Sequence, residues 1–244
     1  MATSALDTLM NSDNTAVNAD LIVGIPGQSL QSSTRDMSML LDRQVDQVSA
    51  YPLMDFPYTK MKTRLSLHGQ YRLLNALTTL GTDSGYVRSS VWTWTRPSSP
   101  KYTSITRHNY VGLGAGAASF LSQYFWLNTF DVEAYVREIE HGRSPVALST
   151  CLNHQEASLY RLFWQCYEGE FDLGSGEALA IPLLPRLTGL AERLGLVDRA
   201  SSAVRLTQKG FFLYHLLERY YTRRYIGRLW HRCRTSAFPA GLVL

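Results

Sequence analysis

The sequence predicts an α/β chain, with a parallel sheet in its first part and a mostly helical second part. Residues 19–23 form a short apolar run that ends at the glycine-containing turn 24–27. Residues 32–43 then repeat apolar side chains at helical spacing, and a second strand-like run follows at 47–53. Strand, helix and strand in this order form a βαβ unit, in which functional residues gather at the carboxyl ends of the strands.

The next segments alternate between short elements and turns. A helix is predicted over residues 70–80, with Gly81 placed to cap its end. Residues 85–106 combine β-forming side chains with turn residues, which predicts strands joined by a loop. Small residues around Gly112, Gly114 and Gly116 permit close approach of the backbone.

The second part of the chain is predicted to be mostly helical. Apolar spacing indicates helices at 131–140, 155–167 and 181–194. Two short strands at 196–199 and 203–206 precede a long helix that opens at 207–210. A hairpin followed by a helix in this way is typical of a winged-helix domain.

The composition is that of a soluble globular protein. With 45% hydrophobic and 18% charged residues, the 244-residue chain can bury a substantial core. Its apolar runs are shorter than the roughly 18 residues that cross a bilayer. Its N-terminal segment lacks a basic start followed by an apolar core, as a secretory signal would have. We therefore expect a cytoplasmic protein with no membrane partner.

Common metal and cofactor motifs are absent from the sequence. Cys151, Cys166 and Cys233 lie far apart, which predicts reduced, structural thiols. The histidines show no zinc-binding spacing, and no GxGxxG, GxSxG or Walker motif occurs. We predict no metal ligand and assign no catalytic residue.

Five segments together resemble one protein family. They are DLIVGIPGQS at 20–29, VSAYPL at 48–53, Gly85-Tyr86, residues 102–109 and GLGAGAAS at 112–119. In this order they resemble the oxygen-independent coproporphyrinogen III oxidase (HemN-like) group of radical SAM proteins, over most of residues 17–217. The segments 90–97, 102–109 and 128–130 are more similar to its anaerobic haem-degradation branch (ChuW/HutW type).

The resemblance implies a fold and a chemistry. The fold is the C-terminal half of a radical SAM TIM-like barrel, with a HemN-type extension, over residues 1–145. A mostly helical, winged-helix-like domain, similar to the HemN C-terminal domain, follows at 146–244. The cofactors would be S-adenosyl-L-methionine (SAM) and a 4Fe–4S cluster. The substrate would be a tetrapyrrole, either haem that is methylated and opened or coproporphyrinogen III that undergoes oxidative decarboxylation.

The resemblance also implies residues that bind SAM. Asp20 and Ile22 match positions that line the SAM pocket, and Gly24 and Gly27 match the turn beside it. The Asp20 carboxylate can accept hydrogen bonds from the hydroxyl or ammonium groups of SAM, and a structural cap is the alternative. Two further positions match the pocket, where core packing is the alternative: Met54 and Ala118.

Three polar residues before the glycine-rich segment are candidates for binding the substrate. Arg107 can pair with a propionate, and His108 can contact a porphyrin or its metal. Asn109 shares their position in the family pattern, and a structural role is the favoured interpretation for each. Trp92 and Trp94 share one face of a strand, where core packing is favoured over stacking on a macrocycle.

The chain departs from the family at the cofactor. The family's cluster motif, CxxxCxxC, is missing, as is the GGGTP segment that holds SAM. Because a 4Fe–4S cluster needs converging thiolates, the chain resembles a fragment, a split gene product or a degenerate relative that is inactive alone. Half a barrel leaves a strand edge unpaired, which predicts a separate chain carrying the missing half, or self-association.

Two functions therefore remain open. The chain is a fragment of a radical SAM enzyme that acts on a tetrapyrrole, or it is a non-catalytic haem- or porphyrin-binding module without the cluster. Nucleic-acid binding by the arginine-rich end at 209–234 ranks last, because charged, solvated helices are common.

Overall fold

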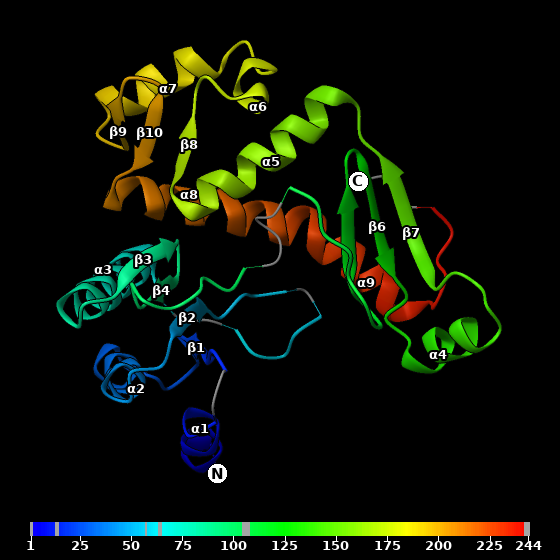
Figure 1. Cartoon of the computed structure of the whole chain (residues 1–244), viewed down its shortest axis with the longest axis horizontal. Coiled ribbons are helices and arrows are strands. Elements are labelled where there is room, and N and C mark those ends of the chain that lie inside the picture. The colour runs from blue at the N-terminus through cyan, green and yellow to red at the C-terminus, as the bar shows by residue number, and fades with distance from the viewer. Residues whose placement is uncertain (1, 13–14, 57, 63–64, 104–107, 242–244) are drawn as a thin grey trace. The chain divides into compact units, whose positions relative to one another are not determined.

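The computed structural model describes residues 2–12, 15–56, 58–62, 65–103 and 108–241 (Figure 1). It divides into two compact units, each of which is described by itself. Unit 1 comprises Met1–Asp55 and Thr59–Tyr102, and unit 2 comprises Phe56–Tyr58 and Thr103–Leu244. The domain division predicted between residues 145 and 146 stays a prediction. Among the described residues, every helix is too short or too polar to cross a bilayer.

Unit 1 is a four-stranded sheet with helices packed against it. Its elements are α1 (Ala2–Met10), β1 (Asn18–Val23), α2 (Leu30–Asp42), β2 (Gln47–Pro52), α3 (Leu67–Asp83), β3 (Val87–Ser90) and β4 (Thr93–Thr95). The strand order is β1-β2-β4-β3, in which β1 and β2 run parallel and β4 runs antiparallel to both of its neighbours. The predicted βαβ unit is present, and the sheet continues with antiparallel strands.

The turn between β1 and α2 is built by two glycines and a helix cap. Gly24 and Gly27 have φ values of 75° and 88°, a region that favours glycine. The Gln28 side-chain oxygen accepts a hydrogen bond from the Gly24 N–H at 2.8 Å. Ser29 caps α2, since its hydroxyl accepts from the N–H of Ser32 at 3.0 Å. These local contacts fix where β1 ends and α2 begins.

Trp92 and Trp94 lie in the core of unit 1, with exposed fractions of 1% and 0%. The packing role favoured for them is therefore confirmed. Gly81 lies within α3, and a Cβ there would stand 2.8 Å from the Trp94 ring. The prediction that Gly81 ends its helix is wrong, because this glycine lets the indole pack against the helix backbone. The chain turns after α3 at Gly85, with a φ of 80°.

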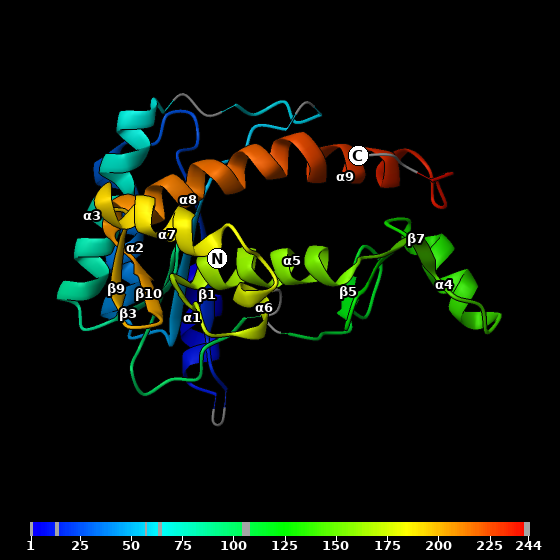
Figure 2. The same cartoon turned by 90° about the horizontal axis from the view of Figure 1, so that it is seen from above.

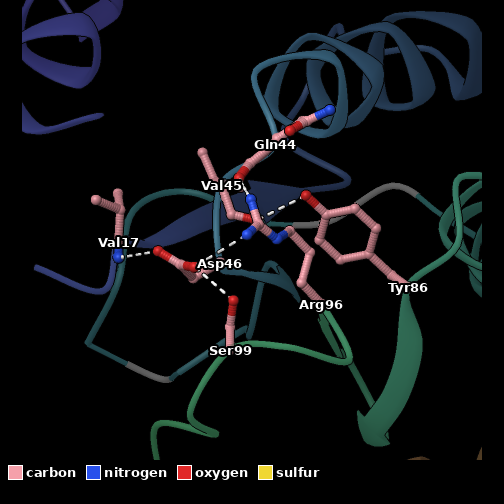
Figure 3. Close-up of polar contacts among 7 residues, drawn as sticks. All are labelled: Val17, Gln44, Val45, Asp46, Tyr86, Arg96 and Ser99. Atoms are coloured by element: carbon pink, nitrogen blue, oxygen red, sulfur yellow. Dashed lines mark hydrogen bonds and ion pairs between the residues drawn. The ribbon is translucent and has the colours of Figure 1, made fainter. Parts of the chain in front are cut away.

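Asp46 ties the starts of β1 and β2 to the segment after β4 (Figure 3). Its carboxylate accepts hydrogen bonds from the Val17 N–H at 2.7 Å and from the Ser99 hydroxyl at 2.5 Å. The Arg96 guanidinium lies 4.0 Å from the same carboxylate. These contacts hold the amino ends of the two parallel strands, opposite to the turn at Gly24.

Unit 2 contains two three-stranded antiparallel sheets, ordered β5-β6-β7 and β8-β10-β9. Its elements are β5 (Ala118–Leu121), β6 (Tyr124–Asn128), α4 (Val132–Glu140), β7 (Val146–Cys151), α5 (His154–Glu168), β8 (Glu170–Asp172), α6 (Gly176–Leu179), α7 (Leu184–Arg193), β9 (Val197–Ala200), β10 (Ala203–Leu206), α8 (Gln208–Tyr221), η1 (Thr222–Ile226) and α9 (Gly227–Thr235). The predicted helices are found as α4, α5 and α7, and the predicted hairpin as β9 and β10.

The helical end of unit 2 runs through three segments without a break. Figure 2 shows α8 in orange continuing into α9 in red as one rod. Thr207 caps its start, where its hydroxyl accepts from the Gly210 N–H at 3.1 Å. The middle segment, η1, is a π-helix, in which the Gly227 N–H bonds to the Thr222 carbonyl. Such segments are rare and occur often at functional sites.

Candidate functional site

Five of the residues matched to a SAM pocket lie on β1, in the turn after it and at the end of β2, whereas the sixth, Ala118, begins β5 in unit 2. In the parallel register, Asp20 pairs with Ser49 and Ile22 pairs with Tyr51. Asp20 and Ile22 share one face of the sheet because they alternate along the strand. Both are exposed, Ile22 by 56%. The Asn18 amide donates to Asp20 Oδ1 at 3.1 Å, which leaves the carboxylate with further acceptor capacity.

Met54 lies beside the glycine turn. The Leu53 N–H donates to the Val23 carbonyl at 2.8 Å, so the next residues, Met54 and Gly24, leave neighbouring strand ends. Gly24 is buried, Met54 is half-buried and Gly27 is exposed. The structure thus gathers these sequence-predicted residues along β1, in the turn after it and at the carboxyl end of β2: Asp20, Ile22, Gly24, Gly27 and Met54.

A small cavity of about 120 Å³ adjoins the turn. It is lined by Gly24, Gln28, Ser29, Leu30, Ser33, Leu65, Gly69, Arg72 and Leu73. Ligand pockets usually measure about 300–1,000 Å³, so this cavity can hold a small polar group and not a whole nucleoside cofactor. Arg72 gives it a cation that can pair with a carboxylate. The residues here therefore fit one end of SAM and leave the rest of the molecule outside this cavity.

The sheet face that carries Asp20 is polar and hydrogen-bonded. The Gln47 amide nitrogen donates to Asn18 Oδ1 at 3.3 Å and to the Tyr102 carbonyl at 3.1 Å. The Gln47 amide oxygen accepts from the Tyr102 N–H at 3.0 Å and from the Thr95 hydroxyl at 3.1 Å. Every donor and acceptor site of this amide is used. Through Asn18, Gln47 therefore orients the Asp20 carboxylate.

This polar face has a signal in the sequence that motif matching overlooks. Polar and apolar side chains alternate over residues 47–50 and 92–95, which directs the polar ones to one side of the sheet. Ser49 and Thr93 lie on that side and are 1% and 6% exposed. Buried polar groups of this kind need partners, and their hydroxyls lie 3.4 Å apart.

The glycine-rich loop of unit 2 is a rigid support. The Asn128 amide donates to the carbonyls of Gly112 at 3.4 Å and Gly114 at 3.0 Å, and the Tyr135 hydroxyl accepts from the Gly114 N–H at 3.1 Å. A Cβ at Gly112 would overlap the Ala118 carbonyl oxygen, which is the close approach that the sequence suggested. These contacts occupy much of the loop's polar backbone and position Ala118 at the start of β5.

The candidate substrate residues are partly accounted for. Arg107 lies outside the described residues. The exposed His108 ring has its Nδ1 3.7 Å from Glu177 Oε1. The Asn109 side-chain oxygen accepts from the Ser122 N–H at 2.7 Å, which braces the turn between β5 and β6. Contact of these residues with a substrate stays a prediction.

A larger cavity, of about 680 Å³, lies within unit 2. It is lined by Tyr58, Gly116, Phe130, Asp131, Trp230, Cys233, Arg234, Thr235, Ser236 and Ala237. The sequence does not reveal it, because its lining comes from segments that are distant in the chain. Gly116 belongs to the glycine-rich segment already singled out, and it is the link between that motif and this cavity.

The described residues do not fit an iron–sulfur cluster. They contain no group of three His, Cys, Asp or Glu side chains placed to hold a metal. Cys151 is exposed, whereas Cys166 packs among Leu162, Ile181 and other apolar side chains. Burial raises the pKa of the Cys166 thiol to about 12, so it is protonated at neutral pH. Cluster binding requires thiolates, and these thiols do not supply a set of them.

Comparison with known proteins confirms the resemblance read from the motifs. No protein-family model matches the chain. It is 25% identical over 233 residues to anaerobilin synthase from Escherichia coli O157:H7, covering 86% of this chain and 50% of that protein. It is 23% identical over 164 residues to oxygen-independent coproporphyrinogen III oxidase from Cereibacter sphaeroides, covering 58% of this chain and 36% of the oxidase. The chain thus spans half or less of the length of these relatives.

A solved structure has the same fold. Coproporphyrinogen III oxidase (HemN) from Escherichia coli, described as a radical SAM enzyme, superposes with a TM-score of 0.64. The match has 17% sequence identity and covers 82% of this chain and 53% of the oxidase. At this identity, the likeness establishes a mixed α/β HemN fold.

Proposed function

We propose that this chain forms part of the SAM- and tetrapyrrole-binding region of a HemN-like radical SAM enzyme. The observation that carries the proposal is the position of the DLIVGIPGQS segment. It forms β1 and the glycine turn, and it presents the matched residues along one strand and its end. Similarity to anaerobilin synthase over 86% of the chain supports the same assignment.

Each matched residue has a physical role in this proposal. The Asp20 carboxylate, oriented by Asn18, accepts hydrogen bonds from hydroxyl or ammonium groups of SAM. Ile22 and Met54 offer apolar contact at the strand ends, and Gly24 and Gly27 allow the turn to approach the ligand closely. SAM, when bound to a reduced cluster, supplies the radical chemistry of this protein class. Ala118, at the start of β5 in unit 2, stays a predicted pocket residue on the strength of the family pattern alone.

The cluster would be held by ligands outside these 244 residues. The sequence has no CxxxCxxC motif, and the thiols described above do not fit a cubane. A separate chain, or a segment not included in this sequence, would supply these ligands. The reaction would be haem methylation with ring opening, or oxidative decarboxylation of coproporphyrinogen III. Arg107, His108 and Asn109 remain the proposed contacts to the substrate, and the proposed location is the cytoplasm.

The competing function is a tetrapyrrole-binding module without catalysis. The missing cluster ligands favour it, whereas the oriented Asp20 carboxylate favours SAM binding. The two differ in whether the chain binds SAM, because a porphyrin carrier does not need that cofactor.

The order of elements after residue 153 supports a winged-helix-like tail. It runs α5, β8, α6, α7, β9 and β10, and β10 pairs with both β8 and β9. Leu183, Leu187 and Leu190 on and beside α7 are each more than half exposed. An apolar outer face of this kind is unsuited to the phosphate backbone. Nucleic-acid binding by the arginine-rich segment 209–234 stays the prediction that ranks last.

The test measures SAM binding and cluster formation separately. We expect calorimetry to detect SAM binding by the wild-type chain, and Asp20→Asn to weaken it by roughly tenfold, the effect of one hydrogen bond to a charged group. Asp42→Asn, at an exposed helix end, is the matched control. After anaerobic reconstitution, iron and sulfide should stay substoichiometric. A complete cluster would contradict the proposal that its ligands lie elsewhere, and absent SAM binding would favour the carrier.

A further inference from the structure

We propose that the 680 Å³ cavity of unit 2 binds a tetrapyrrole by the flat face of its macrocycle and by the carboxylates at its edge. The inference rests on the proposed function and deepens it, because it gives the tetrapyrrole lining contacts in addition to the predicted contacts with His108 and Asn109. The cavity lies within one unit, between the glycine-rich segment around Gly116 and the end of α9.

Aromatic rings form the walls of this cavity. Tyr58 stacks on Phe56 with 5.2 Å between ring centroids and an angle of 7° between the planes. The centroid of the Tyr58 ring also lies 6.0 Å from that of the His231 ring. The centroid of the Trp230 ring lies 5.5 Å from that of the Phe56 ring. Two of the wall rings, Tyr58 and Trp230, are therefore held by neighbours before any ligand binds. Fixed flat rings favour a ligand that is itself flat and aromatic.

The third aromatic ring of the lining, Phe130, packs beside Gly116. Gly116 has a φ of 71°, and a Cβ at this position would lie 3.5 Å from the Phe130 ring. The Gly116 N–H donates to the Thr129 carbonyl at 2.7 Å, which fixes the loop beside that ring. A larger side chain at Gly116 would have to adopt a strained backbone and would enter the space next to Phe130. The glycine-rich motif thus keeps this wall close and the cavity open.

The cationic edge of the cavity comes from α9. The Arg234 guanidinium lies 5.2 Å from the centroid of the Tyr58 ring, a position that suits a cation–π contact. α9 has the sequence GRLWHRCRT, which contains arginines and no acidic residue. Burial raises the pKa of Tyr58, while the charge of Arg234 acts in the opposite direction. A protonated Tyr58 hydroxyl and Arg234 can both donate hydrogen bonds to a carboxylate.

Asp131 adds to the cavity lining a carboxylate, whose charge is opposite to that of Arg234. Its Oδ1 accepts a hydrogen bond from the Ala134 N–H at 2.8 Å and caps α4. A ligand carboxylate near Asp131 would be repelled, whereas one near Arg234 would be attracted. The lining therefore orients an amphiphilic anion with its charged groups toward the α9 end. A compact phosphate would leave the aromatic walls without a matching surface.

The volume agrees with this ligand class. A cavity of about 680 Å³ lies inside the usual range of roughly 300–1,000 Å³ for sites that bury a small molecule. Cys233 closes part of the wall and is 2% exposed, and burial raises the pKa of its thiol. A neutral thiol adds apolar surface and no charge that would repel a carboxylate.

The test is titration of the full chain with metal-free coproporphyrin III, followed by porphyrin fluorescence and by quenching of tryptophan. A metal-free probe excludes binding through an iron–histidine bond. We expect Arg234→Gln to weaken binding by roughly tenfold or more. Arg232→Gln, which removes an exposed arginine of the same helix outside the lining, should bind as the wild type does. Ala237→Trp, which fills the cavity, should abolish binding, and Ala240→Trp is its control.

The outcomes separate the two proposals. Binding that is lost in Arg234→Gln and Ala237→Trp and kept in the controls supports the cavity. Binding by the wild type that all four variants retain overturns the cavity assignment and leaves the proposed tetrapyrrole function standing. A wild-type chain that binds no porphyrin overturns the tetrapyrrole function itself. Circular dichroism of each variant shows whether a loss of binding reflects a loss of fold.

Discussion

The Asp46 carboxylate accepts a hydrogen bond from the Ser99 hydroxyl at 2.5 Å, although the two residues are separated by 53 positions in the sequence (Figure 3). The contact closes unit 1 at the amino ends of its parallel strands. Burial raises the pKa of Asp46, but hydrogen bonds from Ser99 and Val17 and the charge of Arg96 outweigh it, so the pKa lies below its ordinary value. The carboxylate is therefore a stabilising group in its charged form.

Asp46→Asn should lower the free energy of unfolding by about 2 kcal/mol near neutral pH. The amide keeps one oxygen acceptor and replaces the other with a donor, which leaves the Ser99 hydroxyl or the Val17 N–H without its acceptor. Because the folded pKa is lowered, the wild-type contribution is present above the unfolded pKa of about 4 and is lost as the pH falls through the folded value. Urea unfolding between neutral and acidic pH measures both effects.

The matched control for Asp46→Asn is Asp42→Asn, at the exposed end of α2. This variant should leave the acid limb of the stability profile as in the wild type. Equal pH dependence in the wild type and Asp46→Asn would show that ionisation of the Asp46 carboxylate does not contribute to stability.

Gly81→Ala should destabilise unit 1 by about 1–3 kcal/mol, the usual result of overpacking a core. Alanine normally favours a helix over glycine, but its Cβ would stand 2.8 Å from the Trp94 ring. At Gly69, near the start of the same helix, an added Cβ would lie 3.4 Å from its closest neighbour, the Ser66 hydroxyl oxygen. Gly69→Ala should therefore be neutral or gain up to about 1 kcal/mol. The denaturant midpoints of Gly81→Ala and Gly69→Ala measure these effects. A decrease in both midpoints would refute the packing argument.

Cys151 should react with an alkylating reagent before Cys166 does. Cys151 is exposed and should be labelled rapidly in the native chain. Cys166 has a pKa raised to about 12 by burial, so it should be labelled only after denaturant unfolds the chain. Mass spectrometry of timed samples measures the order, and labelling of Cys166 at the rate of Cys151 would show that its apolar surroundings open in the native state.

The same thiol predicts a pH effect on stability. The unfolded chain loses the Cys166 proton near the ordinary pKa of 9.0, whereas the folded chain keeps it up to about 12. Stability should therefore fall as the pH rises through this interval, and Cys166→Ala should remove that part of the slope. A slope identical in the variant would assign the alkaline loss to other groups.

The chain should associate through β1, which in the described part of unit 1 pairs with β2 alone. An edge strand with exposed apolar side chains is a template for pairing with another strand. Light scattering should report species larger than a monomer, and Ile22→Lys should shift them toward the monomer. Leu113→Lys, at a loop residue that is 87% exposed, should not. A monodisperse wild-type monomer would contradict this prediction.

The sequence predicts local structure well where one segment decides it. The apolar run before Gly24 and the helical spacing after it identify the βαβ unit, because both signals lie within a few turns of chain. Gly81 shows the limit of this approach, since a glycine near a helix end has the same signature whether it caps the helix or admits a ring such as Trp94. Only the tertiary contact distinguishes the two.

The site is less predictable for the same reason. Asp20 and Met54 could be matched from motifs that occupy single strands. The 680 Å³ cavity could not, because Tyr58, Gly116 and Arg234 come together only when distant segments fold. Their side chains carry no shared spacing that a reading along the chain would detect.

The π-helix between α8 and α9 makes the cavity sensitive to the length of the chain. Deleting one residue from Thr222–Ile226 would allow an ordinary α-helix to continue, and it would turn every later side chain by roughly 100° about the helix axis. Trp230, Cys233 and Arg234 would then face a different direction as a group. The direction in which the α9 side chains point therefore depends on the number of residues before them as well as on their types. A single deletion outside the lining would remove this wall while every lining residue remained in the sequence.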